Sequence, residues 1–283
     1  MAMVCLSDFE AYAKKHLPKI AWDYFAAGAD DCSTRDENIL AYKRIRFRPR
    51  MLRDVSMMDI RTKLLGTEIS FPVGIAPTGF HQLAWPDGEK STARAATAMN
   101  ICYIASTYST CTLEEIAAAA PGGIRWFQLY IHCNRAVSQQ LVQQAEALGF
   151  QGLVLTADLP YTGKRRDDIR NGFRLPPHMK LKNLEGAFEI DALVEVVEAV
   201  QGKIEVYLDG GIRKGSDVLK ALALGAKCVF IGRPALWGLA YKGEEGLQDV
   251  LRILQDEFRL SMALAGCASI SEIGRHLVQF SKL

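Results

Sequence analysis

From about residue 70 onward, short apolar runs alternate with amphipathic segments. The apolar runs lack the strict alternation of a half-exposed sheet, so they are typical of strands buried on both faces. Amphipathic helices between such strands predict a parallel sheet with its helices outside it. The predicted strands are residues 71–76, 101–106, 126–130, 152–158, 204–208 and 228–231.

Helices are indicated by apolar spacing and by helix-start signals. Thr112 and Glu115 have the spacing of a capping box, and Ser7 and Glu10 predict another, which starts an N-terminal helix that reaches about residue 17. Pro18 then ends that helix or starts a second one. The further predicted helices cover residues 137–148, 190–200 and 216–224 and a long last segment that includes 247–258.

Two parallel architectures compete, a closed (β/α)8 barrel and an open doubly wound sheet. No GxGxxG sequence follows an early strand, so the dinucleotide-binding form of the open sheet lacks its signature. Polar or glycine-containing clusters instead follow nearly every predicted strand, where barrel enzymes place their sites. The clusters are Pro77-Thr78-Gly79, Ser106-Thr107, Gln128 with Tyr130, Thr156 with Asp158, Asp209-Gly210-Gly211 and Gly232-Arg233.

The last two clusters predict a phosphate site. YLDGGIRKG (207–215) follows the penultimate strand and IGRP (231–234) the last, which is where barrels bind phosphate. Glycines let backbone N–H groups approach an anion, while Arg213 and Arg233 supply positive charge. The alternative is that the glycines serve tight turns and the arginines are merely exposed.

Composition limits the class of protein. The chain has 283 residues, 49% hydrophobic and 23% charged, which is ordinary for a globular protein with one sizeable core. A single domain over 1–283 is therefore expected. The net charge of +2, with acids and bases mixed, gives no field that favours nucleic acid or a membrane surface, so neither is predicted as a partner.

Cysteines and the C-terminal residues bear on the compartment. Seven scattered cysteines without a CxxC pair are typical of reduced intracellular thiols and predict no metal site. No segment approaches the roughly 18 apolar residues of a membrane span. Ser281-Lys282-Leu283 matches the peroxisomal address, so we expect a peroxisomal import receptor as partner.

Six segments together are similar to one known family. They are WDYFAAGADD (22–31), IAPTGF (75–80), WFQLY (126–130), TADLPYTGKRRDDIRNGFRLPP (156–177), YLDGGIRKG (207–215) and FIGRPALWGLA (230–240). The chain resembles the FMN-dependent α-hydroxy-acid oxidases, the glycolate oxidase family, over nearly its whole length. Within that family it looks most similar to the peroxisomal 2-hydroxy-acid oxidases of animals.

The resemblance implies a TIM-type (β/α)8 barrel that binds FMN across its C-terminal mouth. The loop after the first strand would line the flavin, polar side chains after the next three strands would hydrogen-bond its ring, and the last two loops would hold the ribityl chain and phosphate. In that order these residues are Pro77, Thr78 and Gly79; Ser106, Gln128 and Thr156; and Asp209, Gly210, Gly211, Ile212, Arg213, Gly232 and Arg233.

The resemblance also implies a reaction, the oxidation of a small 2-hydroxy acid to a 2-oxo acid with reduction of O₂ to hydrogen peroxide. Tyr24 and Tyr130 would contact the carboxylate or hydroxyl of the substrate, and Arg165 would pair with its carboxylate. The family's tryptophan after the second strand is Tyr108 here, so substrate size is harder to infer. A folded chain is expected to form a homo-oligomer.

One departure from the family pattern is large. KLKNLEGAFE (180–189) runs directly into IDALVEVV (190–197), which is similar to the helix after the family's sixth strand. Strands five and six would then be absent, together with a lysine beside the flavin, an arginine and a Ser-Asn-His-Gly segment that carries the catalytic base. Two βα units correspond to on the order of 60 residues. We expect an N-terminal helical extension over 1–65, an incomplete barrel over 66–283, and a gap between the fourth and fifth of the six strands.

Three readings of function remain open. The chain is an oxidase impaired by loss of its base, an inactive truncated or splice-like product, or an unrelated sugar-phosphate barrel enzyme such as an aldolase. The last is disfavoured because no lysine stands within the predicted strands. None of the five histidines, His16, His81, His132, His178 and His276, lies in a matching motif. His81 and His132 follow predicted strands, and a buried or exposed structural role is favoured over a replacement base.

Overall fold

Six parallel strands form the central sheet of the computed structural model, which describes residues 2–132, 134–157, 163–184 and 205–280. The strand order is β7-β6-β5-β4-β9-β8, and every neighbouring pair is parallel. β4 and β9 pair although they are the first and last of the six in sequence, which is the closure of a TIM-type barrel. The strands are β4 (Val73–Ile75), β5 (Tyr103–Ala105), β6 (Arg125–Leu129), β7 (Gly152–Leu155), β8 (Tyr207–Asp209) and β9 (Cys228–Ile231).

The two ends of this sheet are open. β7 has only β6 as a neighbour and β8 has only β9 among the described strands. Leu153 of β7 is 50% exposed and Val206, directly before β8, is 63% exposed, whereas every residue of β6 is buried. Over the described residues the sheet is therefore a curled, incomplete barrel of six strands, and the predicted gap between the fourth and fifth strands is confirmed there.

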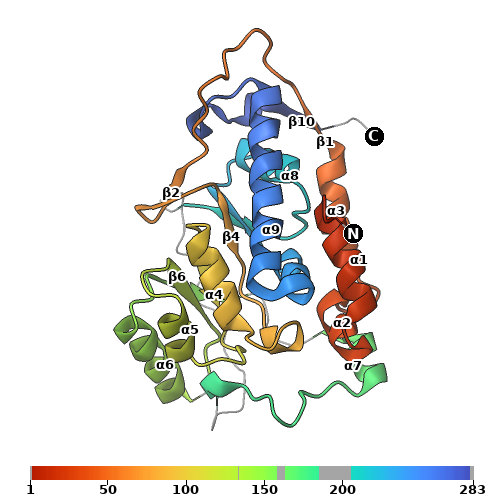
Figure 1. Cartoon of the computed structure of the whole chain (residues 1–283), viewed down its shortest axis with the longest axis vertical. Helices are drawn as coiled ribbons and strands as arrows, with labels where there is room; N and C mark the ends of the chain where they lie inside the picture. The colour runs from red at the N-terminus through yellow and green to blue at the C-terminus, as the bar shows by residue number, and fades with distance from the viewer. Residues whose placement is uncertain (1, 133, 158–162, 185–204, 281–283) are drawn as a thin grey trace.

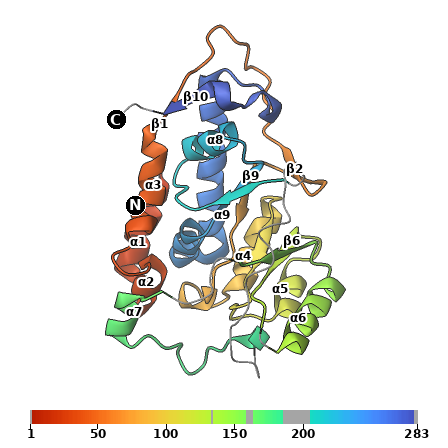
Figure 2. The same ribbon diagram turned by 180° about the vertical axis from the view of Figure 1, so that it is seen from behind.

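Helices cover one face of the sheet. α4 and α9 lie in front of the strands in Figure 1, and in Figure 2, from behind, β6 and β9 are in front. α9 has non-helical dihedral angles at Lys242 and Gly243, so it is two helical pieces joined at a kink. The helices on this side are α4 (Glu89–Ala98), α5 (Leu113–Ala119), α6 (Arg135–Ala147), α8 (Gly215–Ala223) and α9 (Arg233–Ala265).

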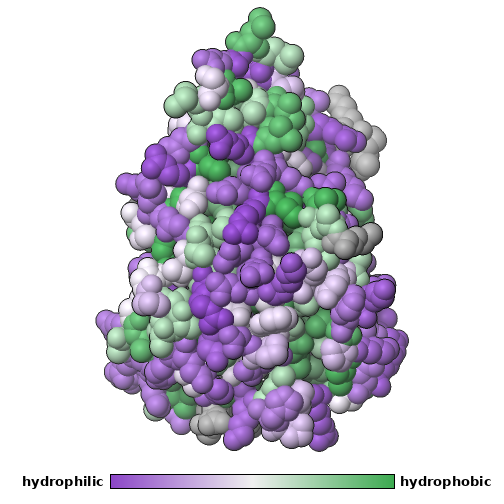
Figure 3. Space-filling model, viewed as in Figure 1, coloured by the Kyte–Doolittle hydropathy of each residue, from purple (hydrophilic) through white to green (hydrophobic). Residues whose placement is uncertain are grey.

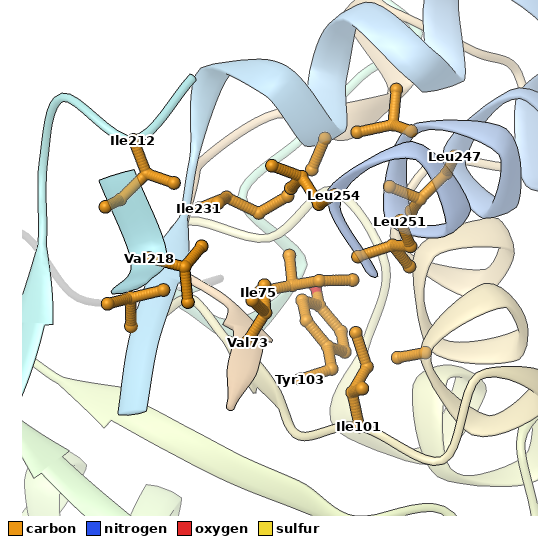
Figure 4. Packing of buried hydrophobic residues seen from close by; sticks show 14 of the residues in the cluster. Val73, Ile75, Ile101, Tyr103, Ile212, Val218, Ile231, Leu247, Leu251 and Leu254 are labelled. Atoms are coloured by element: carbon orange, nitrogen blue, oxygen red, sulfur yellow. The ribbon is translucent and has the colours of Figure 1, made fainter. Parts of the chain in front are cut away.

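Successive residues along the strands point to opposite faces of the sheet and belong to two separate apolar clusters, one on each face. The larger lies under the helices, where Val73 and Ile75 of β4 pack toward Leu251 of α9 (Figure 4). The smaller fills the inner face with Trp126 and Phe230 and is joined by residues of the β2–β3 hairpin. Burial on both faces explains why these strands read as continuous apolar runs.

The N-terminal segment packs against the C-terminal helix and is tied to the chain end. Phe9 of α1 meets Tyr241 of α9 edge to face, with ring centroids 5.4 Å apart. Strand β1 pairs antiparallel with β10. The bounds are α1 (Leu6–His16), α2 (Lys19–Ala26), α3 (Ser33–Ala41), η1 (Tyr42–Arg44), β1 (Ile45–Phe47), β2 (Thr62–Leu64), β3 (Thr67–Ile69), η2 (His81–Leu83), α7 (Arg166–Asn171), η3 (Lys182–Leu184), η5 (Ile270–Glu272), η6 (Arg275–Leu277) and β10 (Val278–Phe280).

The helix-start predictions have mixed outcomes. The capping box of α5 is confirmed, since Thr112 N–H donates to Glu115 Oε2 at 2.9 Å and Glu115 N–H donates to Thr112 Oγ1 at 3.1 Å. The box predicted at Ser7 is wrong: α1 begins at Leu6, because the Asp8 carboxylate accepts from the N–H groups of the residues just before the helix, at 2.9 and 3.2 Å. Pro18 precedes α2, so it marks a restart. The helix predicted at 190–200 lies outside the described residues.

The surface is mixed in character. On the face in Figure 3, hydrophilic residues are interspersed with smaller hydrophobic areas. Among the described residues, no helix has the length and apolar content that a bilayer crossing needs.

Candidate cofactor and substrate site

A cavity of about 400 Å³ lies at the C-terminal ends of β8, β9 and β4. It brings together eleven of the residues predicted for the site, from five separate stretches of sequence. The loops after β8 and β9 both line it, so their predicted adjacency is confirmed. The eleven are Tyr24, Thr78, Gly79, Arg165, Asp209, Gly210, Gly211, Ile212, Arg213, Gly232 and Arg233.

Glycine is required in the loop after β8. Gly211 has φ +74°, and a Cβ there would lie 2.1 Å from the backbone oxygen of Asn38 on α3. Gly210, at φ +116°, is also in a region that favours glycine. The chain therefore comes close to α3 at this point, and backbone rather than side chain forms this wall of the cavity.

Arginine dominates the charge of the cavity. Arg165, Arg213 and Arg233 line it, and Asp209 is the one carboxylate among its described lining residues. Burial lowers the pKa of the Arg233 guanidinium, and the charges of Arg213, Arg35 and Arg165 lower it further. An anion bound here would raise that pKa again, because a nearby opposite charge favours the charged form. Arg233 is held in place because it donates to the carbonyls of Phe25 and Ala27, each at 2.9 Å.

Asp217 organises the backbone beside this cluster. Its Oδ2 accepts from the N–H groups of Arg213 and Lys214, both at 3.1 Å, at the start of α8. These two N–H groups are engaged by a side chain, so the convergence of N–H groups predicted for this loop would have to come from other positions. Gly232 stands at the N-cap of α9, whose N-terminus is a favourable place for a phosphate.

A second set of polar groups joins the ends of β5, β6 and β7. Ser106 Oγ donates to Gln128 Oε1 at 3.3 Å, and Gln128 Nε2 donates to Thr156 Oγ1 at 2.8 Å. The structure thus brings together the three side chains predicted to contact a flavin ring, at the barrel mouth but outside the lining of the cavity. Pro77, two residues after the end of β4, is half-buried and also lies outside that lining.

The predicted substrate residues form an aromatic cluster with one arginine. Arg165 ion-pairs with Asp168, and its guanidinium lies 5.0 Å from the centroid of the Tyr24 ring. Burial raises the pKa of Tyr24 to about 12, so its hydroxyl stays protonated at neutral pH and can donate to a carboxylate. Tyr130 packs against Tyr108 with ring centroids 5.1 Å apart, and it does not line the cavity.

Sequence reasoning missed three participants. Phe173 stacks on Tyr24 with ring centroids 4.4 Å apart, and Asn38 reaches the cavity from α3. Asp168 pairs with Arg165 at a spacing of three residues, the one local signal that was available. The other two depend on packing between segments far apart in sequence.

None of the five histidines lines the cavity. His81 is fully buried, and its ring nitrogens contact Thr78 Oγ1 and Thr92 Oγ1. His132 is buried, with its Nδ1 accepting from the Asn134 N–H at 3.2 Å. The remaining three are exposed. The structural interpretation of the histidines is thereby favoured over a replacement base.

The residues present fit the phosphate and ribityl end of a flavin mononucleotide, since an arginine-rich cavity with a glycine-built wall lies beside a helix N-terminus. The chain belongs to the FMN-dependent dehydrogenase family, which it matches over residues 13–189 and again over 186–280. The two matches meet where the missing segment was inferred from the sequence. FMN is the cofactor of this family.

Relatives and solved structures agree with this assignment. The chain is 50% identical to 2-hydroxyacid oxidase 2 of Bos taurus and to that of Homo sapiens, with all of each chain covered. The bovine alignment has 353 positions, and 353 minus the 283 residues of this chain leaves 70 positions opposite gaps. A soluble mutant of (S)-mandelate dehydrogenase from Pseudomonas putida is 29% identical with a TM-score of 0.92, covering 99% of this chain and 100% of its own. Mandelate oxidase with benzoyl-formic acid is 33% identical with a TM-score of 0.92 and full coverage of both chains.

Proposed function

We propose that this chain binds FMN and a small 2-hydroxy acid, and that it oxidises the acid to a 2-oxo acid only slowly, with O₂ reduced to hydrogen peroxide. The names of its relatives supply the substrate class. The observation that carries the impairment is that no histidine lines the cavity, although the cofactor residues are assembled around it.

The chain's own residues divide into two tasks. Arg213 and Arg233 hold the phosphate of the cofactor. Tyr24 donates a hydrogen bond from its protonated hydroxyl to the substrate carboxylate, and the positive charge of Arg165 pairs with that carboxylate. When bound, FMN would supply an acceptor for the hydride equivalent, one hydrogen with two electrons, that leaves the α-carbon. Oxidation also needs a group that takes the hydroxyl proton of the substrate within hydrogen-bond reach, and the described cavity offers no imidazole for it.

The test is hydrogen peroxide production by the purified chain with FMN and a panel of 2-hydroxy acids. We expect a rate at least about a hundredfold below that of the bovine relative, because a positioned general base contributes about 10²–10⁴ in rate. Turnover near the relative's rate would show that another residue serves as base. His81→Gln and His132→Gln would then be the first variants to assay.

A second candidate is a truncated or splice-like product without catalytic function. The open edges of β7 and β8 favour it, because an incomplete barrel exposes apolar side chains that a closed one buries. The two candidates differ in flavin binding. A yellow protein that turns over slowly supports the first, whereas a chain that retains no FMN at micromolar flavin supports the second.

We further propose that the chain is imported into peroxisomes through Ser281, Lys282 and Leu283 and assembles as a homo-oligomer once folded. The tripeptide at the chain end supports import. A fluorescent protein fused to the N-terminus is expected in peroxisomes, and deletion of the three residues should disperse it. Light scattering of the purified chain would measure the oligomeric state.

A further inference from the structure

A buried hydrogen-bond network lies directly behind the cofactor cavity. Thr78 lines the cavity, and its Oγ1 contacts Nε2 of His81. His81 is fully buried, and its Nδ1 lies 2.8 Å from Thr92 Oγ1 on α4. The imidazole thus connects a residue of the cavity wall to a helix that the cavity does not touch.

The direction of each hydrogen bond in this network follows from the groups present. Burial lowers the pKa of His81, so its ring is neutral at pH 7 and has one N–H and one acceptor nitrogen. Thr92 Oγ1 lies 3.5 Å from the Gly88 carbonyl, which can only accept, so the Thr92 hydroxyl donates there. Thr92 therefore accepts from His81 Nδ1–H. Nε2 remains as the acceptor, and the Thr78 hydroxyl must donate to it.

We propose that His81 is a positioning residue of the cofactor cavity: protonated at Nδ1, it binds the hydroxyl proton of Thr78 at Nε2, so that the Thr78 hydroxyl offers a bound group only lone pairs. The proposal rests on the flavin assigned to this cavity. Any hydrogen bond between the Thr78 hydroxyl and that ligand is then one in which the ligand donates from an N–H or O–H group. A ligand that places an acceptor there would be disfavoured.

Glu89 holds the backbone of His81 in place. The carboxylate of Glu89 is fully buried and accepts from the His81 N–H at 3.1 Å. It also accepts from the N–H and hydroxyl of Thr110 at 2.9 and 2.6 Å and from the Cys111 N–H at 3.1 Å. One carboxylate thereby joins the loop after β4 to the loop after β5. One of these four hydrogen bonds fixes the backbone of His81, and the other three hold the Glu89 carboxylate that accepts it.

The tautomer can be measured directly, without cofactor. In the chain labelled with ¹⁵N at histidine, the His81 resonances are assigned by their loss in His81→Gln, and ring nitrogen shifts distinguish a protonated from an unprotonated site. We expect a neutral ring with a proton on Nδ1 and none on Nε2. A proton on Nε2, or an imidazolium at pH 7, overturns the proposal.

A matched pair of variants tests the effect on the cavity. Gln at position 81 places its amide near the Nε2 position and can still accept from Thr78, whereas Asn places it near Nδ1 and leaves the Thr78 hydroxyl unheld. By fluorescence titration with FMN, we expect His81→Asn to raise the Kd about fivefold and His81→Gln to change it by less than about twofold, the value of one hydrogen bond.

In a Thr78→Val background the Asn and Gln variants should bind FMN equally. Equal effects in the native background, or a difference that persists with valine at position 78, would refute the positioning role. Failure of the unmodified chain to bind FMN would count against the proposed function alone, because the tautomer measurement still decides the arrangement of His81.

Discussion

Removal of the Arg213 guanidinium tests the phosphate end of the site independently of the rest of the flavin cavity. Arg213 lines the cavity, and burial lowers the pKa of its guanidinium, so its charge is held where water solvates it poorly. Its Nη1 donates to the Ile212 carbonyl at 3.0 Å. Since a guanidinium has five N–H donors, others remain for an anion. Arg213→Ala is therefore expected to weaken FMN binding.

The size of the effect follows from the kind of bond lost. Hydrogen bonds to charged groups contribute roughly 1.5–3 kcal/mol each, which corresponds to about a 10- to 150-fold increase in Kd if one such bond to the phosphate is removed. Arg213→Lys keeps the charge but loses the fork, so its effect should be intermediate.

The assay is titration of the chain with FMN and, separately, with riboflavin, which lacks the phosphate. Arg213→Ala should raise the Kd for FMN by that factor and leave the Kd for riboflavin nearly unchanged. Arg252→Ala is the matched control, since it removes the same charge from an exposed position of α9, where Arg252 pairs with Asp249. The reasoning is refuted if both flavins lose affinity equally or if the control variant matches Arg213→Ala.

Three further predictions concern stability and association. Glu89→Gln should lower the free energy of unfolding by about 1–3 kcal/mol in urea titrations, because the NH₂ group of the new amide would face at least one N–H donor. Glu114→Gln, at an exposed position, should lower it by less than about 0.5 kcal/mol. Equal losses in the two variants would contradict this prediction. Leu153→Lys places a charge on the open edge of β7 and should reduce aggregation, measured by light scattering. Ile169→Lys is the control, because Ile169 is an exposed residue of α7, and it should reduce aggregation less. Equal effects of the two variants would show that the open edge is not the cause of aggregation. The pKa of Tyr24 is raised from 10 to about 12, so the stability linked to its protonated form is present below pH 10 and lost as pH rises through about 12. The urea midpoint of the native chain should therefore fall more steeply over that range than that of Tyr24→Phe, and parallel curves would argue against burial of this hydroxyl.

The sheet was largely predictable because each strand is buried on both faces. Continuous apolar runs in the sequence predicted the positions of all six strands. The polar clusters that follow these strands lie at one edge of the sheet, because parallel strands end on the same side. Within the described residues the structure shortens most of these runs, as for β4, where the predicted 71–76 becomes Val73–Ile75. The apolar residues beyond the hydrogen-bonded ladder still pack in the core.

Features that depend on distant packing could not be predicted in this way. The contact of Asn38 with the loop after β8 and the stacking of Phe173 on Tyr24 join segments without a local signal. The α9 kink at Gly243 is similar, because that glycine is packed against Trp85, where a Cβ would lie 2.4 Å from the indole. At the start of α1 the cap is formed by Cys5 and Asp8, whereas the pattern favoured Ser7 and Glu10, two residues further along. The division at residue 65 and the import signal stay predictions.

The pairing of β4 with β9 sets an order on synthesis. Val73 of β4 pairs with Val229 of β9. Of the six strands, β4 is synthesised first and β9 last, so this pair can form only after β9 has been made. Roughly 160 residues separate the two, and at about 5–20 residues per second a ribosome needs on the order of 10–30 s to make them. Throughout that time one side of β4 has no native partner in the nascent chain. We therefore expect the growing polypeptide to need chaperones during its translation, and slowing elongation should increase the fraction that is degraded before release.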